Sequence, residues 1–143
     1  MDASAEVSER AIRQCVELYN RRTVEWVDSC YAVDAEWTEL PTLATPRGRG
    51  GKRAVLRAAA ERALAFFPDR QMKIRNLVAQ GQQVVLELEW SGTAAAAVGS
   101  VKPGTTVRLR IASFFTVVDG LITKHTDYCV PDGGEWQSRP TSG

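Results

Sequence analysis

The stretch FFTVVDGLITKHTDY, residues 114–128, decides the fold. Two runs of β-branched and aromatic residues flank Asp119-Gly120, a pair typical of two-residue hairpin turns. The pattern therefore predicts antiparallel strands over residues 105–118 and 121–129. Because side chains alternate along a strand, the second strand has two faces, one with Thr123, His125, Asp127 and Cys129, the other with Ile122, Lys124, Thr126 and Tyr128.

The residues before this hairpin predict the remaining elements. Period-two patterns indicate three more strands, over residues 34–41, 71–80 and 83–92. Apolar residues at three- and four-residue spacing predict three helices, over residues 5–22, 23–30 and 52–66. Ser4 or Ser8 and then Thr23 are the candidate helix caps. Helices followed by a strand meander are typical of an α+β domain, so we expect helices on one face of a curved antiparallel sheet.

Length and composition indicate one domain with a real core. The chain has 143 residues, of which 44% are hydrophobic. A chain of this size buries roughly two-thirds of its unfolded surface, enough for a core and a pocket inside it. We expect a single domain over residues 1–131. Residues 132–143 are rich in Gly, Pro, Ser and Thr and are predicted to form a loose tail.

The charge balance excludes the commonest polyanionic partners. Eighteen Lys and Arg side chains oppose 17 Asp and Glu side chains. Such a chain has no overall field that would attract nucleic acid or an anionic membrane surface. The sequence shows no export signal and no apolar run long enough to span a membrane. We expect a soluble, cytoplasmic protein.

Cysteine and histidine usage argues against a metal site and a disulfide framework. Cys15, Cys30 and Cys129 are odd in number and widely spaced, which indicates free thiols in a reducing compartment. His125 is the only histidine, so few nitrogen ligands exist for a metal. We predict no metal and no cofactor.

One glycine-rich segment resembles a phosphate-binding loop but lacks its chemistry. The segment GRGGKRA, residues 48–54, has no four-residue spacer, and Lys52 is followed by Arg53 rather than Ser or Thr. We interpret residues 42–51 as a loop that leads into the helix.

Two carboxylates remain as candidates for acid/base chemistry. His125 and Asp127 lie side by side on one face of the last strand, either toward an apolar interior or toward solvent. Glu39 shares a strand face with Trp37, and is either a second buried carboxylate or a residue at the rim. Glu87 and Glu89 alternate with apolar residues and are expected outside. The wall of a pocket would come from the apolar faces of the helix and strands, namely Tyr19, Trp37, Leu88, Trp90, Leu109 and Ile111.

These residues together resemble a known family. The order of elements, and the segments DAEWTELP (34–41), FFPD (66–69), WSGT (90–93) and the hairpin 114–128, are similar to SnoaL-like polyketide cyclases. These belong to the nuclear-transport-factor-two-like superfamily, with the ketosteroid isomerases and limonene epoxide hydrolases. The resemblance covers roughly residues 8–130.

The resemblance implies a cone-shaped α+β barrel, a deep apolar cavity and a homodimer. It assigns Asp127 the place of the aspartate that serves as acid/base in an intramolecular aldol closure. Epoxide hydrolases of the superfamily need an Arg and a second Asp where this chain has Leu88 and Trp90. The cyclases often carry a histidine where Ala94 stands.

Three functions therefore stay open. The first is a cofactor-free cyclase or isomerase of polyketide-type secondary metabolism. It would act on an apolar or aromatic small molecule through Asp127, with His125 assisting and Glu39 in reserve. The second is an enzyme that opens an epoxide or adds water. The third is a non-catalytic domain for small-molecule binding or dimerisation, because fold alone does not fix function.

Overall fold

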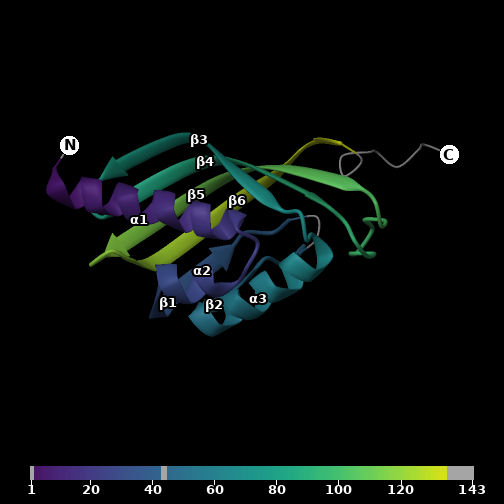
Figure 1. The fold of residues 1–143 in the computed structure, drawn as a ribbon, viewed down its shortest axis with the longest axis horizontal. Coiled ribbons are helices and arrows are strands. Elements are labelled where there is room, and N and C mark those ends of the chain that lie inside the picture. Colours follow the sequence, from purple (N-terminus) through teal and green to yellow (C-terminus); the bar gives the residue numbers. More distant parts are fainter. Residues whose placement is uncertain (1, 43–44, 135–143) are drawn as a thin grey trace.

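The chain folds as three helices packed on one curved sheet (Figure 1). The structure, a computed structural model, describes residues 2–42 and 45–134. The helices are α1 (Ala3–Asn20), α2 (Glu25–Cys30) and α3 (Arg53–Phe66). The strands are β1 (Tyr31–Glu39), β2 (Arg49–Lys52), β3 (Gln71–Gln80), β4 (Gln83–Thr93), β5 (Thr106–Val118) and β6 (Leu121–Gly134). The predicted α+β class is confirmed.

The sheet has the order β2-β1-β6-β5-β4-β3. Its neighbours pair in antiparallel fashion except β1 and β6, which run parallel. The expectation of a purely antiparallel sheet is corrected by this pair. No hairpin links β1 to β6, so the turn geometry that enforces antiparallel pairing does not constrain them. The edge strands β2 and β3 do not pair with each other, and the sheet stays open.

All three helices pack on the concave face of this sheet. Helix α1 packs on β3, β4 and β5, whereas α3 packs on β1 and β2. Helix α2 lies between them and also contacts β1 and β6. Figure 1 shows α1 crossing in front of the long strands, with α2 and α3 below it beside β1 and β2. The buried apolar side chains lie between these layers.

The hairpin that decides the fold forms as predicted. Asp119 and Gly120 have φ values of 51° and 77°. Positive φ at both central residues is the geometry whose twist matches that of two paired strands. Asp119 tolerates this conformation better than most residues, and Gly120 adopts it without steric cost.

The predicted capping residues of α1 and α2 are both wrong. Asp2, rather than Ser4 or Ser8, caps α1, because its side chain accepts a hydrogen bond of 2.7 Å from the Ala5 backbone N–H. Ser8 is buried inside the first turns and donates to the Gly81 carbonyl oxygen. In α2 the cap position is Val24, and no side chain makes the capping hydrogen bond, so Thr23 does not fill that role.

The predicted loop over residues 42–51 contains a strand instead. Residues Arg49–Lys52 form β2, which pairs with the end of β1. A Cβ at Gly50 would lie 2.5 Å from the Trp37 carbonyl oxygen. Glycine at this position permits close approach of two backbones, whereas the sequence pattern had indicated only flexibility.

The last strand also departs from simple alternation at its start. Thr116 pairs with Lys124 but Val117 pairs with Ile122, so Thr123 is an extra residue in β6. This bulge turns Ile122 into the core, where it is 1% exposed, rather than onto the outer face. From His125 onward the predicted alternation holds. The strand continues to Gly134, and residues 135–143 of the predicted tail lie outside the described residues.

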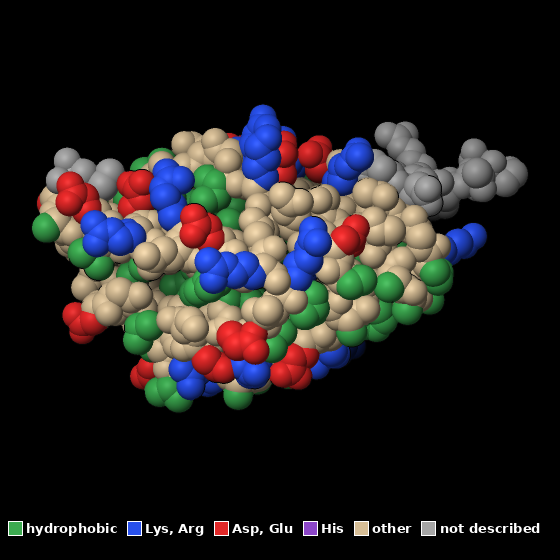
Figure 2. Space-filling view, viewed as in Figure 1, with side chains coloured by type: hydrophobic (Ala, Val, Ile, Leu, Met, Phe, Trp, Pro, Cys, Tyr) green, Lys and Arg blue, Asp and Glu red, His purple; other side chains and the backbone are tan. Residues whose placement is uncertain are grey.

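The surface carries mixed charge. Figure 2 shows basic and acidic side chains interspersed over one face of the molecule, with no histidine visible on it. Among the helices that the structure describes, none combines the length and the apolar character needed to cross a bilayer.

Candidate active site

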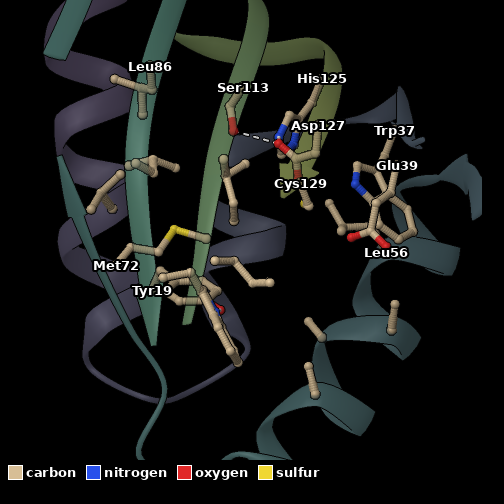
Figure 3. Close-up of a pocket in the computed structure, with 18 of the residues that line it drawn as sticks. Tyr19, Trp37, Glu39, Leu56, Met72, Leu86, Ser113, His125, Asp127 and Cys129 are labelled. Carbon is tan, nitrogen blue, oxygen red and sulfur yellow. Dashed lines mark hydrogen bonds and ion pairs between the residues drawn. The ribbon is translucent and has the colours of Figure 1, made fainter. Parts of the chain in front are cut away.

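A cavity of about 220 Å³ lies between the concave face of the sheet and the helices (Figure 3). Its walls are mostly apolar side chains. The structure brings every predicted site residue to this cavity, from four strands and one helix: Tyr19, Trp37, Glu39, Leu88, Trp90, Leu109, Ile111, His125 and Asp127. The sequence could not decide whether His125 and Asp127 face inward. In the structure both face inward, since they line the cavity and their side chains are only 10% and 13% exposed.

Strand register places residues of the site in two rows across β1, β6 and β5. Trp37 on β1, His125 on β6 and Phe115 on β5 form one row across three strands. Glu39, Asp127 and Ser113 form the next row. The parallel β1–β6 pair therefore sets the two candidate carboxylates beside each other.

Asp127 is held by two hydrogen-bond donors. Its Oδ1 accepts a hydrogen bond of 2.5 Å from Ser113 Oγ and lies 2.6 Å from His125 Nε2 (Figure 3). A carboxylate can only accept, so the His125 Nε2 carries the hydrogen in this contact. Oδ2 of Asp127 has no hydrogen-bond partner among residues 2–42 and 45–134. It is left to contact a molecule in the cavity.

His125 is oriented from its other side by Tyr31. The Tyr31 hydroxyl lies 2.7 Å from His125 Nδ1. Burial raises the pKa of Tyr31 well above its ordinary value, so the phenol stays protonated at neutral pH. The hydroxyl then donates to Nδ1 of the neutral imidazole, which agrees with a hydrogen on Nε2. The ring of Phe115 stacks on His125 with 4.3 Å between centroids.

Glu39 has a different environment. Its carboxylate pairs with Arg49, whose Nε lies 3.0 Å from Oε1, and Thr45 Oγ1 donates to the same oxygen at 3.3 Å. Arg49 also lies over the Trp37 ring, 5.2 Å from its centroid. Glu39 is thus partly buried in an ion pair with Arg49, whose side chain is 36% exposed, and both residues line the cavity.

Glu87 and Glu89 lie on the outer face of the sheet, as predicted. They pair with Arg110 and Arg75, respectively, on neighbouring strands. Within the described ranges, no three His, Cys, Asp or Glu side chains are placed to hold a metal ion.

Sequence reasoning missed three residues of the site. Ser113 lies two residues after Ile111 on β5, so strand alternation alone predicts its inward position but not its role. Tyr31 lies before the predicted start of β1, and Arg49 lies within the segment interpreted as a loop. Only the pairing of β1 with both β2 and β6 brings Tyr31 and Arg49 to the cavity.

Comparison with known proteins places the fold. A family model described as a SnoaL-like domain matches residues 12–125, a range that includes His125 and ends two residues before Asp127. Among curated protein sequences none matches this chain. Solved structures with the same fold are numerous.

Three of these structures cover most of both chains. AclR of Streptomyces galilaeus, a proposed hydroxylase, is 20% identical with a TM-score of 0.75, over 88% of this chain and 80% of its own. IdmH of Streptomyces antibioticus, a proposed polyketide cyclase, is 24% identical with a TM-score of 0.73, over 85% and 91%. A proposed polyketide cyclase of Acidithiobacillus ferrooxidans is 22% identical with a TM-score of 0.69, over 90% and 91%. At these identities the likeness concerns the fold.

Proposed function

Because the chain belongs to the SnoaL-like domain family, we propose that it is a cofactor-independent cyclase or isomerase of polyketide-type metabolism. Its substrate is an apolar carbonyl compound, and Asp127 is the general base and acid. The observation that carries this proposal is the buried Ser113–Asp127–His125 arrangement at the wall of an apolar cavity. A carboxylate with one free oxygen in such a cavity is suited to proton transfer at carbon.

The reaction begins with removal of a proton next to a carbonyl group. Asp127 Oδ2 takes this proton, and the electron pair of the broken C–H bond moves into an enolate. In an isomerase, Asp127 returns the proton to another carbon. In a cyclase, the enolate carbon bonds to a second carbonyl carbon of the same molecule, and Asp127 protonates the resulting alkoxide.

His125 and Ser113 keep the base in position. Both donate to Oδ1 of Asp127, which leaves Oδ2 directed to the substrate. Tyr31 fixes the His125 ring in turn. The apolar wall, with Leu88, Trp90 and Ile111, excludes water and holds a flexible chain in a folded pose.

The test uses 2-tetralone, a bicyclic ketone with acidic C–H bonds, in deuterated water. Exchange of its α-hydrogens, followed by NMR, reports proton abstraction without requiring the natural substrate. We expect the wild-type protein to accelerate exchange and Asp127→Asn to lose about 10²-fold or more of that acceleration. Glu87→Gln is the matched control, because it removes a carboxylate from the outer face of the sheet.

Three outcomes would overturn the proposal. Equal exchange by wild type and Asp127→Asn would remove Asp127 as the base. Absence of any acceleration by wild type would favour the binding-domain reading. If an epoxide probe instead gained labelled oxygen from solvent water in an Asp127-dependent manner, ring opening would replace cyclisation as the function.

A further inference from the structure

The charged side chains of the cavity wall gather on one side of it. Besides His125, the charged residues that line the cavity in the described part of the chain are Glu39, Arg49 and Asp127. Figure 3 shows Glu39 and Asp127 on the same side of the cavity, with Met72 on the other. If Asp127 is the base, the reactive part of the substrate lies at the charged side, and its apolar body lies at the other.

Strand register sets Arg49 in the same row as the base. Arg49 pairs with Glu39 across β2 and β1, and Glu39 pairs with Asp127 across β1 and β6. Neighbouring strands lie about 4.8 Å apart, so the backbones of Arg49 and Asp127 are separated by two strand spacings. The long arginine side chain covers much of such a distance. The Arg49 guanidinium therefore reaches the cavity wall beside the two carboxylates.

The thiol of Cys129 senses these three charges together. Burial raises the pKa of Cys129, and the charges of Asp127 and Glu39 raise it further, whereas the charge of Arg49 lowers it. Cys129 follows Asp127 by two residues on β6, and it lines the same cavity. The positive charge of Arg49 thus acts at the part of β6 that carries the base.

One edge of the Arg49 guanidinium is occupied, and the rest of it is available. Nε and Nη2 donate to Oε1 and Oε2 of Glu39, at 3.0 and 3.4 Å. The guanidinium also lies over the Trp37 ring, with 5.2 Å between Cζ and the ring centroid. Nη1 has no hydrogen-bond partner among residues 2–42 and 45–134. Its two hydrogens can be donated to a molecule in the cavity.

Proton removal next to a carbonyl group needs a donor close to the base. The carbonyl oxygen lies only two bonds from the carbon that loses its proton to Asp127. Negative charge develops on this oxygen as the C–H electron pair moves into the enolate. A cationic donor placed there stabilises the transition state more than the bound ketone. Ser113 and His125 already donate to Oδ1 of Asp127, so they do not fill this role.

We propose that Arg49 is a catalytic residue whose Nη1 donates a hydrogen bond to the carbonyl oxygen of the substrate. This inference rests on the proposed function and specifies its substrate further. The substrate carries its acidic C–H bond and the adjacent carbonyl oxygen at the side of Asp127 and Arg49, and its apolar body extends toward Met72. When Asp127 Oδ2 takes the proton, the enolate oxygen forms beside Arg49, which stays protonated throughout.

The test uses 2-naphthol, an aromatic analogue of the enol of 2-tetralone, bound to the variant Asp127→Asn. The asparagine is uncharged, as Asp127 is once it has taken the proton. Fluorescence over a range of pH follows the ionisation of the bound naphthol. Arg49→Met in this background should raise the pH of ionisation by about one unit or more, because the cation that favours the naphtholate is lost. Arg49→Gln should shift it in the same direction, and it decides the question if Arg49→Met does not fold.

Two controls separate this effect from a loss of structure. Naphthalene has the ring system of the probe without its oxygen, so its affinity should be unchanged in Arg49→Met. Arg75→Met is the matched variant, because Arg75 pairs with Glu89 on the outer face of the sheet. It should leave the ionisation of bound naphthol unchanged. Arg49→Lys keeps a cation and should restore part of the shift.

The exchange of 2-tetralone gives a second measurement. Arg49→Met with Asp127 intact should lose about 10-fold of the acceleration that wild type provides. This loss is smaller than the loss expected for Asp127→Asn, because the Arg49 side chain is 36% exposed and water helps to stabilise the enolate. Full retention of the wild-type acceleration in Arg49→Met would remove Arg49 from the reaction.

Failure of this inference is distinguishable from failure of the proposed function. An unchanged pH of naphthol ionisation in Arg49→Met or Arg49→Gln overturns the role of Arg49. An equal shift in Arg75→Met, or equal losses of affinity for naphthalene and naphtholate, overturns it as well. These equilibrium measurements are made without the Asp127 carboxylate, so they do not depend on the base. Unchanged 2-tetralone exchange in Asp127→Asn overturns the base instead.

Discussion

Glu39 and Asp127 lie directly opposite each other across the parallel β1–β6 pair, yet their partners differ in charge. Glu39 is neutralised by the Arg49 guanidinium, whereas Asp127 is held by Ser113 and His125. Neighbouring carboxylates in different environments take different chemical roles. The ion pair favours a role for Glu39 in the organisation of the cavity wall, and the proposed function makes Asp127 the proton carrier.

The first prediction concerns this division. Glu39→Gln removes the negative charge but keeps the size of the side chain and its capacity to accept from Thr45 and Arg49. We expect the rate of 2-tetralone exchange to fall less than about 10-fold, against about 10²-fold or more for Asp127→Asn. NMR of the ketone in deuterated water measures both. A larger loss in Glu39→Gln than in Asp127→Asn would exchange the two roles.

The second prediction concerns Ser113. Ser113→Ala removes one of the two donors to the Asp127 Oδ1 and leaves a buried carboxylate with less support. We expect the free energy of unfolding to fall by about 1–3 kcal/mol. Urea denaturation of Ser113→Ala, Asp127→Ala and the double variant forms a cycle. Because the two residues contact each other, their effects should not add. Simple additivity would contradict the hydrogen bond.

The third prediction uses the fact that His125 is the only histidine of the chain. Nitrogen-15 NMR therefore reports one imidazole. At a pH where His125 is neutral, its hydrogen should reside on Nε2, because Tyr31 donates to Nδ1 and Asp127 accepts from Nε2. Tyr31→Phe removes the donor to Nδ1 and should shift the Nδ1 resonance, whereas the Asp127 carboxylate keeps the hydrogen on Nε2. A wild-type ring with its hydrogen on Nδ1 would contradict the assignment.

The fourth prediction concerns alkaline pH. Burial raises the pKa of Tyr31 and of the Cys129 thiol above their ordinary values. An acid with a raised pKa in the folded state favours folding below its unfolded pKa, and this contribution is lost as pH rises. Tyrosine and cysteine in unfolded chains ionise near pH 10 and 8.5, respectively. We expect the denaturation midpoint to fall from about pH 9 upward. Tyr31→Phe should show a smaller fall over this range than wild type, and an equal fall would contradict the role of Tyr31.

Much of the site was predictable because strand alternation is a local property. Once 121–129 is a strand, His125 and Asp127 share a face, and the same holds for Trp37 and Glu39 on β1. The apolar faces of β4 and β5 likewise follow from period two. The bulge at Thr123 was not predictable in this way, because an extra residue in a strand is defined by its partner strand.

The sequence by itself determined the α+β class, the main helices and strands and which residues share one face of a strand. These follow from hydrophobic periodicity and turn chemistry, which act over a few residues. Only the tertiary structure decided that β1 lies parallel to β6, that Arg49 neutralises Glu39 and that Tyr31 fixes His125. These relationships join residues up to 94 positions apart, and they arise because several elements must share one core.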